Sequence, residues 1–272
     1  MVRKQRKVKK RRRPKKGGSS EGRTKAVVLL AGLFFTIVIL GTGGFGVYKA
    51  LEKSDFFQVT SLKIEGCSRT SKKLILDLSG IDIHANLLAV NVNKVRARIS
   101  SYEWVESVNV ERQWPNRLVI EVTERVPVAI LNLPKGLYYL DRHGVAFAKV
   151  IPPEDIDYPV ITGLKSDWSS SAAHTAALHE ALRFIHYASR GSSILPKQNI
   201  SEIHLTDQGD AILYLVERPF PIYLGQGETY TAYSRLAKVL YNLYKRKEFS
   251  ETAYIRMDYM EDKVLVGLTG KA

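Results

Sequence analysis

The feature that most constrains this chain is an uncharged run of 23 residues near its N-terminus, from Ala26 to Tyr48. At about 1.5 Å per residue, a helix of this length spans roughly 34 Å, which is enough to cross the hydrocarbon core of a bilayer. The first half of the run is strongly apolar, and the second half, GTGGFGVY, is rich in glycine, which membrane helices tolerate. The run therefore predicts one transmembrane helix over residues 26–48, in contact with membrane lipid.

The charge of the chain is concentrated ahead of this run. The whole sequence has a net charge of +14. Residues 1–25 hold thirteen Lys/Arg and one acid, a net of +12, whereas the other 247 residues hold 28 basic and 26 acidic residues. Because basic residues mark the cytoplasmic side of a membrane helix, we expect residues 1–25 to be a cytoplasmic tail and residues 49–272 to lie outside. The near-neutral remainder excludes a basic globular domain, and we expect no nucleic-acid partner.

Other interpretations of the N-terminal region stay open from the sequence. A cleaved signal peptide has a shorter basic start and a small-residue cleavage site, whereas here the basic start is 25 residues long and no A-x-A motif follows in a suitable place. A twin-arginine export signal is disfavoured because Arg11–Arg13 lies well upstream of the apolar run. A tail that binds nucleic acid or anionic lipid fits the like-charge run, although orientation alone accounts for it.

Residues 57–126 contain a compact series of predicted elements in the order β-α-α-β-β. The strand over residues 60–66 alternates apolar and polar side chains. Thr70 is predicted to cap the first short helix, which Gly80 ends, and Asn93 is predicted to cap the second.

Two longer strands complete this small unit. They are predicted at residues 104–112 and 117–125, joined by a hairpin loop in which Pro115 and Asn116 are turn residues. Alternation along these strands predicts a core that contains Trp104, Val108, Val110, Leu118, Ile120 and Val122.

After a boundary near Val126–Pro127, residues 127–272 are predicted to form a β-rich domain with helices at 172–189 and 229–247. The short turns between its predicted strands favour antiparallel pairing, so the fold class is α+β.

The sequence shows none of the compact motifs of catalytic or metal sites. It has no G-x-S-x-G elbow, no phosphate-binding G-x-x-x-x-G-K-[ST] loop and no H-E-x-x-H. His179 and Glu180 match the first two positions of H-E-x-x-H, but the next histidine is His186. We therefore interpret these residues as the polar face of a helix. We expect no catalytic residue, no metal and no cofactor. The single cysteine, Cys67, excludes an intramolecular disulfide.

Two motifs at the end of the small unit are specific. They are R-x-W-P-N at Arg112–Asn116 and V-x-E-R-x-P-V-A at Val122–Ala129. With weaker matches at Ile64–Gly66, Asn86–Leu88 and Pro159–Gly163, they make the chain resemble the bacterial cell-division protein family FtsQ/DivIB. Near the end, where that family often has D-L-R-Y, this sequence has Arg256-Met257-Asp258-Tyr259, with the charges exchanged.

This resemblance implies that residues 57–126 are a POTRA domain, between a single transmembrane helix and a mixed β-rich domain at residues 127–272. It implies a non-catalytic scaffold of the divisome in the cell (inner) membrane, enriched at the division septum. The implied partners are FtsB-like and FtsL-like division proteins and the machinery of septal peptidoglycan synthesis. A membrane-tethered envelope enzyme, such as a cell-wall hydrolase, stays open as the alternative and would need a cleft with convergent polar groups.

The last predicted strand, residues 263–269, is the candidate partner-binding site. It is apolar on one face and only weakly polar on the other, and no later strand covers it in sequence order. An unprotected apolar edge invites pairing with another chain. The alternative is that the strand lies inside the sheet. The resemblance places the addition of a partner strand here and implies the binding residues Tyr259, Lys263, Val264, Leu265, Val266, Gly267 and Leu268.

Overall fold

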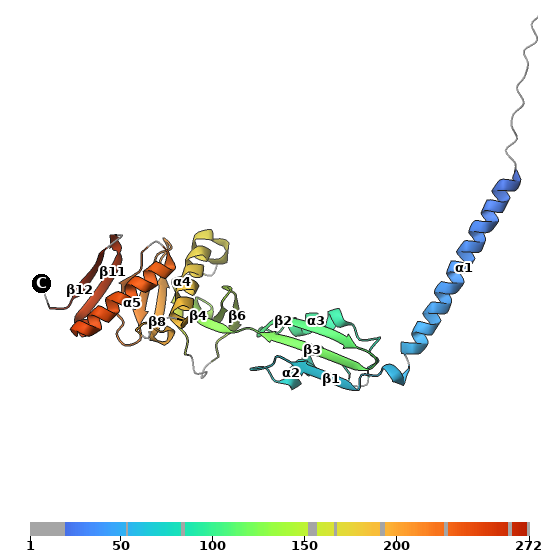
Figure 1. The fold of residues 1–272 in the computed structure, drawn as a ribbon, viewed down its shortest axis with the longest axis horizontal. Helices are drawn as coiled ribbons and strands as arrows, with labels where there is room; N and C mark the ends of the chain where they lie inside the picture. Colours follow the sequence, from blue (N-terminus) through green and yellow to red (C-terminus); the bar gives the residue numbers. More distant parts are fainter. Residues whose placement is uncertain are drawn as a thin grey trace, which may run out of the picture. The chain divides into compact units, whose positions relative to one another are not determined.

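The N-terminal part of the structure is one long helix. The computed structural model describes residues 20–52, 54–82, 85–151, 157–165, 168–190, 194–225, 228–260 and 263–270. Helix α1, Ser20–Glu52, contains the predicted apolar run and extends beyond it at both ends (Figure 1). Its segment Val28–Leu51, with a mean hydropathy of 2.2, is long and apolar enough to cross a membrane. The predicted tail up to residue 19 lies outside the described residues.

The backbone contacts group the chain into two compact units. The first contains the described residues up to Ser61 together with 82–90 and 112–118, and the second contains the rest. Because this division passes through the predicted small unit, the boundary near Val126–Pro127 stays a prediction.

In the part of the chain that the structure describes, a small sheet has three strands in the order β1-β3-β2. Its elements are β1 Ser61–Glu65, α2 Lys72–Ser79, α3 Val92–Ser100, β2 Val105–Gln113 and β3 Arg117–Glu124. The order of elements along the chain is the predicted β-α-α-β-β. Five of the six predicted core residues are buried: Val108, Val110, Leu118, Ile120 and Val122.

Both short helices begin at a different cap from the predicted one. The N-cap of α2 is Ser71 rather than Thr70, and its side chain accepts a hydrogen bond from the backbone three residues on. The N-cap of α3 is Asn91, and Asn93 lies inside the first helical turn. In each case the cap is the residue whose side chain accepts a hydrogen bond from a free N–H group of the first turn. Gly80 ends α2 in the left-handed conformation, as predicted.

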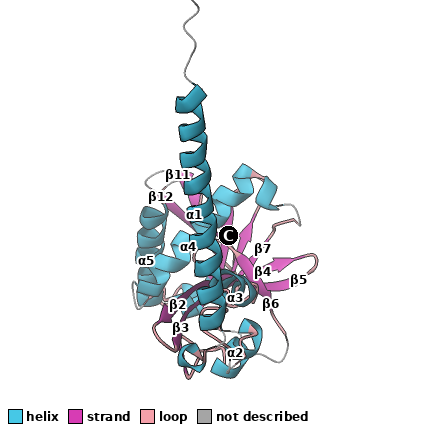
Figure 2. Cartoon of the chain, turned by 90° about the vertical axis from the view of Figure 1, so that its right-hand side faces the viewer, coloured by secondary structure: helices cyan, strands magenta, loops and turns pink. Residues whose placement is uncertain are grey.

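Within the described residues, the large sheet has nine strands in the order β12-β11-β10-β9-β8-β7-β4-β5-β6 (Figure 1). The strands are β4 Pro127–Leu133, β5 Gly136–Asp141, β6 Ala146–Lys149, β7 Val160–Thr162, β8 Ile200–Leu205, β9 Ala211–Leu215, β10 Ile222–Tyr223, β11 Thr252–Met260 and β12 Lys263–Leu268. Helices α4, Ala172–Arg190, and α5, Thr229–Arg246, were predicted within a residue of these bounds. Figure 2 shows the two helices together, with β4, β5 and β7 to one side of them.

The strands joined by short turns pair antiparallel, as predicted, but the sheet as a whole is mixed. β7 pairs in parallel with β4 and β8, and β10 pairs in parallel with β11. Parallel neighbours need a long crossover connection. Helix α4 provides it between β7 and β8, and α5 provides it between β10 and β11. The strand–helix–strand order was visible in the sequence and was the signal for parallel pairs.

The main core lies between the large sheet and the two helices. A row of fully buried side chains crosses the sheet, with Ile222 in register with both Leu213 and Ile255. Val264 and Val266 of β12 are partly buried against this core. The sheet is therefore anchored by apolar packing out to its last strand.

Trp104 does not belong to the small core, contrary to the prediction. Its ring centroid lies 5.1 Å from that of Tyr139 and 5.1 Å from that of Phe147, on β5 and β6. The guanidinium of Arg69 lies 3.8 Å from the centroid of the Trp104 ring. The residue directly before β2 is outside the alternation of that strand, so the pattern of the strand does not fix the direction of its side chain.

Candidate partner-binding edge

β12 is the terminal strand of the large sheet, and among the described strands it pairs with β11 alone. The pairing is antiparallel and continuous where Tyr254, Ile255 and Arg256 face Gly267, Val266 and Leu265. In an antiparallel strand the N–H and C=O groups of every second residue point away from the paired neighbour. β12 therefore presents a row of backbone donors and acceptors on its outer side. The alternative position inside the sheet is wrong for the part of the chain that the structure describes.

The side chains of β12 divide between the two faces of the sheet. Val264 and Val266 pack against the main core, and Leu265, which is 39% exposed, alternates with them. Lys263 is exposed, and Leu268 is partly buried where it pairs with Thr252. An added strand would thus meet apolar side chains on both faces of this edge.

Gly267 makes room for an aromatic ring on the neighbouring strand. A Cβ atom at Gly267 would lie 2.3 Å from Cε1 of Tyr254, which is closer than atoms approach in proteins. The ring of Tyr254, 36% exposed, therefore lies over the backbone of the edge strand. Sequence reasoning missed Tyr254, because its position over Gly267 depends on the register between β11 and β12.

The charged pair that departs from the family pattern is satisfied within β11. Arg256 donates from Nε to Oδ1 of Asp258 at 3.1 Å and from Nη2 to Oδ2 at 2.7 Å. These hydrogen bonds lower the pKa of Asp258 below its ordinary value. The Arg256 guanidinium also lies 4.8 Å from the centroid of the Tyr223 ring. The exchanged charges therefore face each other on β11.

Tyr259, the remaining predicted binding residue, is 59% exposed near the end of β11. The structure thus brings all seven predicted residues to one hairpin, β11–β12. The predicted join at residues 261–262 lies outside the described residues.

Within the described ranges, no group of three or more His, Cys, Asp or Glu side chains is placed to hold a metal ion. His179 and His186 are exposed on α4, which agrees with a polar helix face.

An apolar anchor-length helix, a β-α-α-β-β unit and a mixed sheet that ends in an apolar edge are the elements of a POTRA-containing protein. Residues 57–125 match the POTRA domain of the FtsQ type, and residues 129–258 match the C-terminal domain of the cell division protein FtsQ/DivIB.

Similar proteins cover most of the chain. A cell division protein FtsQ from Geotalea daltonii is 29% identical over 96% of this chain and 94% of its own length. An FtsQ from Geobacter sp. (strain M21) is 31% identical over 84% of this chain and 82% of its own length. An FtsQ from Myxococcus fulvus is 31% identical over 76% and 72%, respectively. The chain belongs to the FtsQ/DivIB family of cell division proteins, and the predicted α+β fold with a POTRA domain is confirmed.

Proposed function

We propose that this protein is a non-catalytic scaffold of the divisome that captures an extended segment of an FtsB-like and FtsL-like pair at the β12 edge. Through this contact it links the pair to the machinery that builds septal peptidoglycan. The family assignment supports a role in division. The observation that carries the proposal is the terminal position of β12, with apolar side chains on both of its faces.

The binding mode follows from the geometry of the edge. A partner strand that pairs with β12 satisfies the outward backbone groups and extends the sheet to a tenth strand. Its alternate side chains contact Val264 and Val266 on one face and Leu265 and Tyr254 on the other. Backbone pairing supplies much of the affinity, and the pockets between these side chains supply selectivity.

Tyr259 and Lys263 frame this contact. Both side chains are exposed, and both lie near the join between β11 and β12, where Met260 and Lys263 are in register. We assign them to contacts with the end of the added strand.

The scaffold is anchored by α1 with the N-terminus in the cytoplasm and residues 49–272 outside, at the division septum of the cell membrane. We assign residues 57–126 to the POTRA domain and 127–272 to the β-rich domain, and the matched ranges 57–125 and 129–258 support this boundary. A reporter that is active only outside the cytoplasm is expected to work when fused after Ala272 and to fail when fused at Gly18. The reverse pattern would exclude the topology.

The decisive experiment removes residues 263–272 from the full chain and measures co-purification of the FtsB-like and FtsL-like pair from membranes. We expect capture to be lost while thermal unfolding still shows a folded POTRA domain. A matched control replaces Lys245, exposed on α5, with Gln and is expected to retain capture. Capture at full strength after the deletion, with the rest of the chain folded, would disprove the role of this edge.

A further inference from the structure

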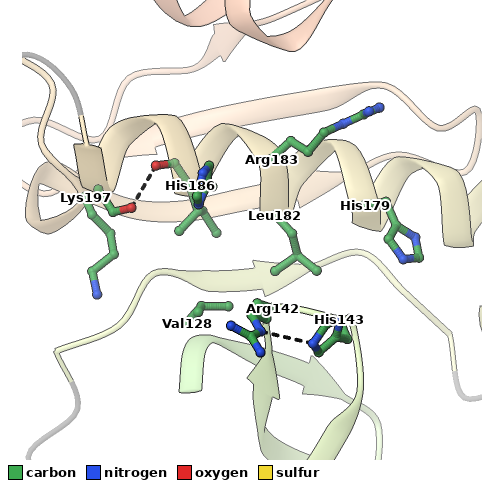
Figure 3. A pocket seen from close by; sticks show the side chains of 10 residues that line it. Val128, Arg142, His143, His179, Leu182, Arg183, His186 and Lys197 are labelled. Carbon is green, nitrogen blue, oxygen red and sulfur yellow. Dashed lines mark hydrogen bonds between the residues drawn. The ribbon is translucent and has the colours of Figure 1, made fainter. Parts of the chain in front are cut away.

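A pocket of about 480 Å³ lies at the opposite end of the strand order from β12, between α4 and the turn that joins β5 to β6 (Figure 3). Its volume is in the range of small-molecule sites. Its floor is apolar and includes Val128 of β4 and Leu182 of α4, which points toward the turn. Its basic and imidazole side chains are Arg142, His143, His179, Arg183, His186 and Lys197.

This cluster was not predicted from the sequence, because its histidines have no common spacing. His143 comes from the β5–β6 turn, whereas His179 and His186 come from successive parts of α4. The fold brings these three histidines to one pocket. Among the described residues that line this pocket, none is an Asp or a Glu.

The charges of this pocket differ in how far they are already paired. Arg183 is paired with Glu180 and points away from the turn. Glu106 lies 3.7 Å from Nη2 of Arg142, which is a loose contact for a guanidinium that is 72% exposed. Arg142 therefore keeps most of its capacity to bind a second anion.

Lys197 is the second available cation. It makes no ion pair within the described part of the chain, and its Nζ lies 5.2 Å from the centroid of the Tyr158 ring. An ammonium group that lies over an aromatic ring keeps its full positive charge, so it can still attract an anion.

The turn that holds Arg142 is fixed by a buried carboxylate. Oδ1 of Asp141, a residue that is 3% exposed, accepts hydrogen bonds of 2.9 Å from the backbone N–H groups of His143 and Val145. Its Oδ2 accepts a hydrogen bond of 2.7 Å from Arg125. The backbone around Arg142 is thus held before any ligand arrives.

The orientation of the guanidinium is constrained as well. Nε of Arg142 donates to Nε2 of His143 at 3.0 Å, so Nη1 and Nη2 remain for other acceptors, with Nη2 in its loose contact with Glu106. Two N–H groups in a planar fork match the two oxygens of a carboxylate or phosphate.

We propose that this pocket binds an organic anion, in which a carboxylate or phosphate group is held by Arg142 with the help of Lys197 and an apolar body lies against Val128 and Leu182. This ligand chemistry complements a cationic rim on an apolar floor. The pocket is separate in sequence and in the sheet from the β12 edge, so it adds a ligand to the function proposed above.

The test is calorimetric titration of the full chain, in neutral dodecyl maltoside micelles at low salt, with benzoate, phenyl phosphate and neutral benzyl alcohol. We expect saturable binding of one or both anions and at least tenfold weaker binding of the alcohol. Arg142→Gln should weaken anion binding by about tenfold or more, since a hydrogen-bonded charge is removed. Lys197→Gln should weaken it by a few-fold.

Two further variants distinguish specific recognition of the anion by the Arg142 guanidinium from a general effect of lost positive charge. Arg142→Lys keeps the charge without the fork and should bind between the wild type and Arg142→Gln. Lys245→Gln removes an exposed positive charge from α5 and should bind like the wild type. Unchanged thermal unfolding of Arg142→Gln would show that the fold is intact. Binding of both anions no tighter than that of benzyl alcohol, or equal anion binding to the wild type and Arg142→Gln, overturns the proposal.

The source of the natural anion is tested in the same system. Lysophosphatidylglycerol added to the micelles should compete with phenyl phosphate if the pocket takes a lipid headgroup. Absence of competition, with the variant effects above in place, supports a soluble anion.

Discussion

The two terminal strands of the large sheet, β6 and β12, differ in length and in the regularity of their pairing. The β6 end is a strand of four residues, Ala146–Lys149, and its register with β5 is interrupted. Phe147 packs there against Trp104, with 5.1 Å between the ring centroids. The β12 end has six residues, and Leu265 is 39% exposed. Short edge strands and irregular pairing are means by which proteins discourage edge pairing.

One terminal strand is thus short and irregularly paired, and the other is longer and regularly paired. β12 pairs continuously with β11 through Leu265, Val266 and Gly267, so its backbone is held extended. An extended, apolar and uncovered strand would promote aggregation without a partner. The predictions below test this contrast.

The largest expected effect is on partner capture. Proline at Leu265 or at Val266 removes a backbone donor and bends β12, so at least one of the two variants should reduce capture of the FtsB-like and FtsL-like pair by about 100-fold. Neighbouring residues direct their N–H groups to opposite sides, so one variant loses an outward donor and the other a bond to β11. Co-purification and affinity measurements on the full chain follow the loss.

The matched control for these variants is Ala146→Pro, at the first residue of β6, where proline is tolerated in strands. It should capture the pair as the wild type does. Equal losses in β6 and β12 variants would show that the two ends of the sheet do not differ in function.

Removal of the cover over β6 should reduce stability. Trp104→Ala deletes a half-buried ring that contacts Tyr139 and Phe147, and we expect a loss of about 2 kcal/mol in the free energy of unfolding, with increased aggregation. Trp114→Ala removes a ring that is 57% exposed and should cost less than about 1 kcal/mol. Similar losses in denaturant unfolding of the two variants would remove the argument that Trp104 protects β6.

A smaller effect is expected from the glycine in β12. Gly267→Ala places a methyl group against the ring of Tyr254, which must turn away, and should cost about 1 kcal/mol of stability and weaken capture several-fold. The additional change Tyr254→Ala should remove most of the stability cost. An unchanged cost in the double variant would mean that the strain arises elsewhere.

The smallest effect is expected at acidic pH in the small sheet. Burial of Glu124 acts to raise the pKa of its carboxyl, but hydrogen bonds from the backbone N–H groups of Arg69, Thr70 and Ser68 outweigh it, so the pKa falls below its ordinary value of 4.5. A lowered pKa in the folded state adds stability above pH 4.5 that is lost as the pH falls through the folded value.

Glu124→Gln should therefore cost about 1 kcal/mol at neutral pH and nothing at a pH below the folded pKa. The same carboxyl holds the segment with Arg69, whose guanidinium lies over Trp104, so acid should also loosen the cover of β6. Unfolding curves of both proteins between neutral and acidic pH provide the measurement. A difference that persists in acid would contradict the role of the charge.

Much of this fold was predictable because its signals are local. The apolar run of α1, the stripe of Leu178 and Leu182 on α4, and the alternation of Val108 and Val110 each depend on a few neighbouring residues. The terminal place of β12 was one of two positions that the sequence left open, and the observed strand order decides between them.

The features that sequence reasoning missed depend on residues far apart in the chain. The parallel pairs β7–β8 and β10–β11 arise because a helix returns the chain to the end of the sheet at which the first strand began. The side chain of Trp104 finds its partners only when β5 and β6 are placed. The basic pocket and the Tyr254–Gly267 contact likewise require a known register or a known helix position.

The short strand β10 has a dynamic consequence for the hairpin beyond it. β10 has two residues, and only Ile255 and Arg256 of the nine-residue β11 are in register with it. The β11–β12 hairpin is thus joined to the sheet by few interstrand bonds and should open locally at a lower free energy than β8 or β9. Its amides should exchange with deuterium earlier than theirs. A bound partner strand should slow that exchange first in β12, so hydrogen exchange would report occupancy of the edge residue by residue.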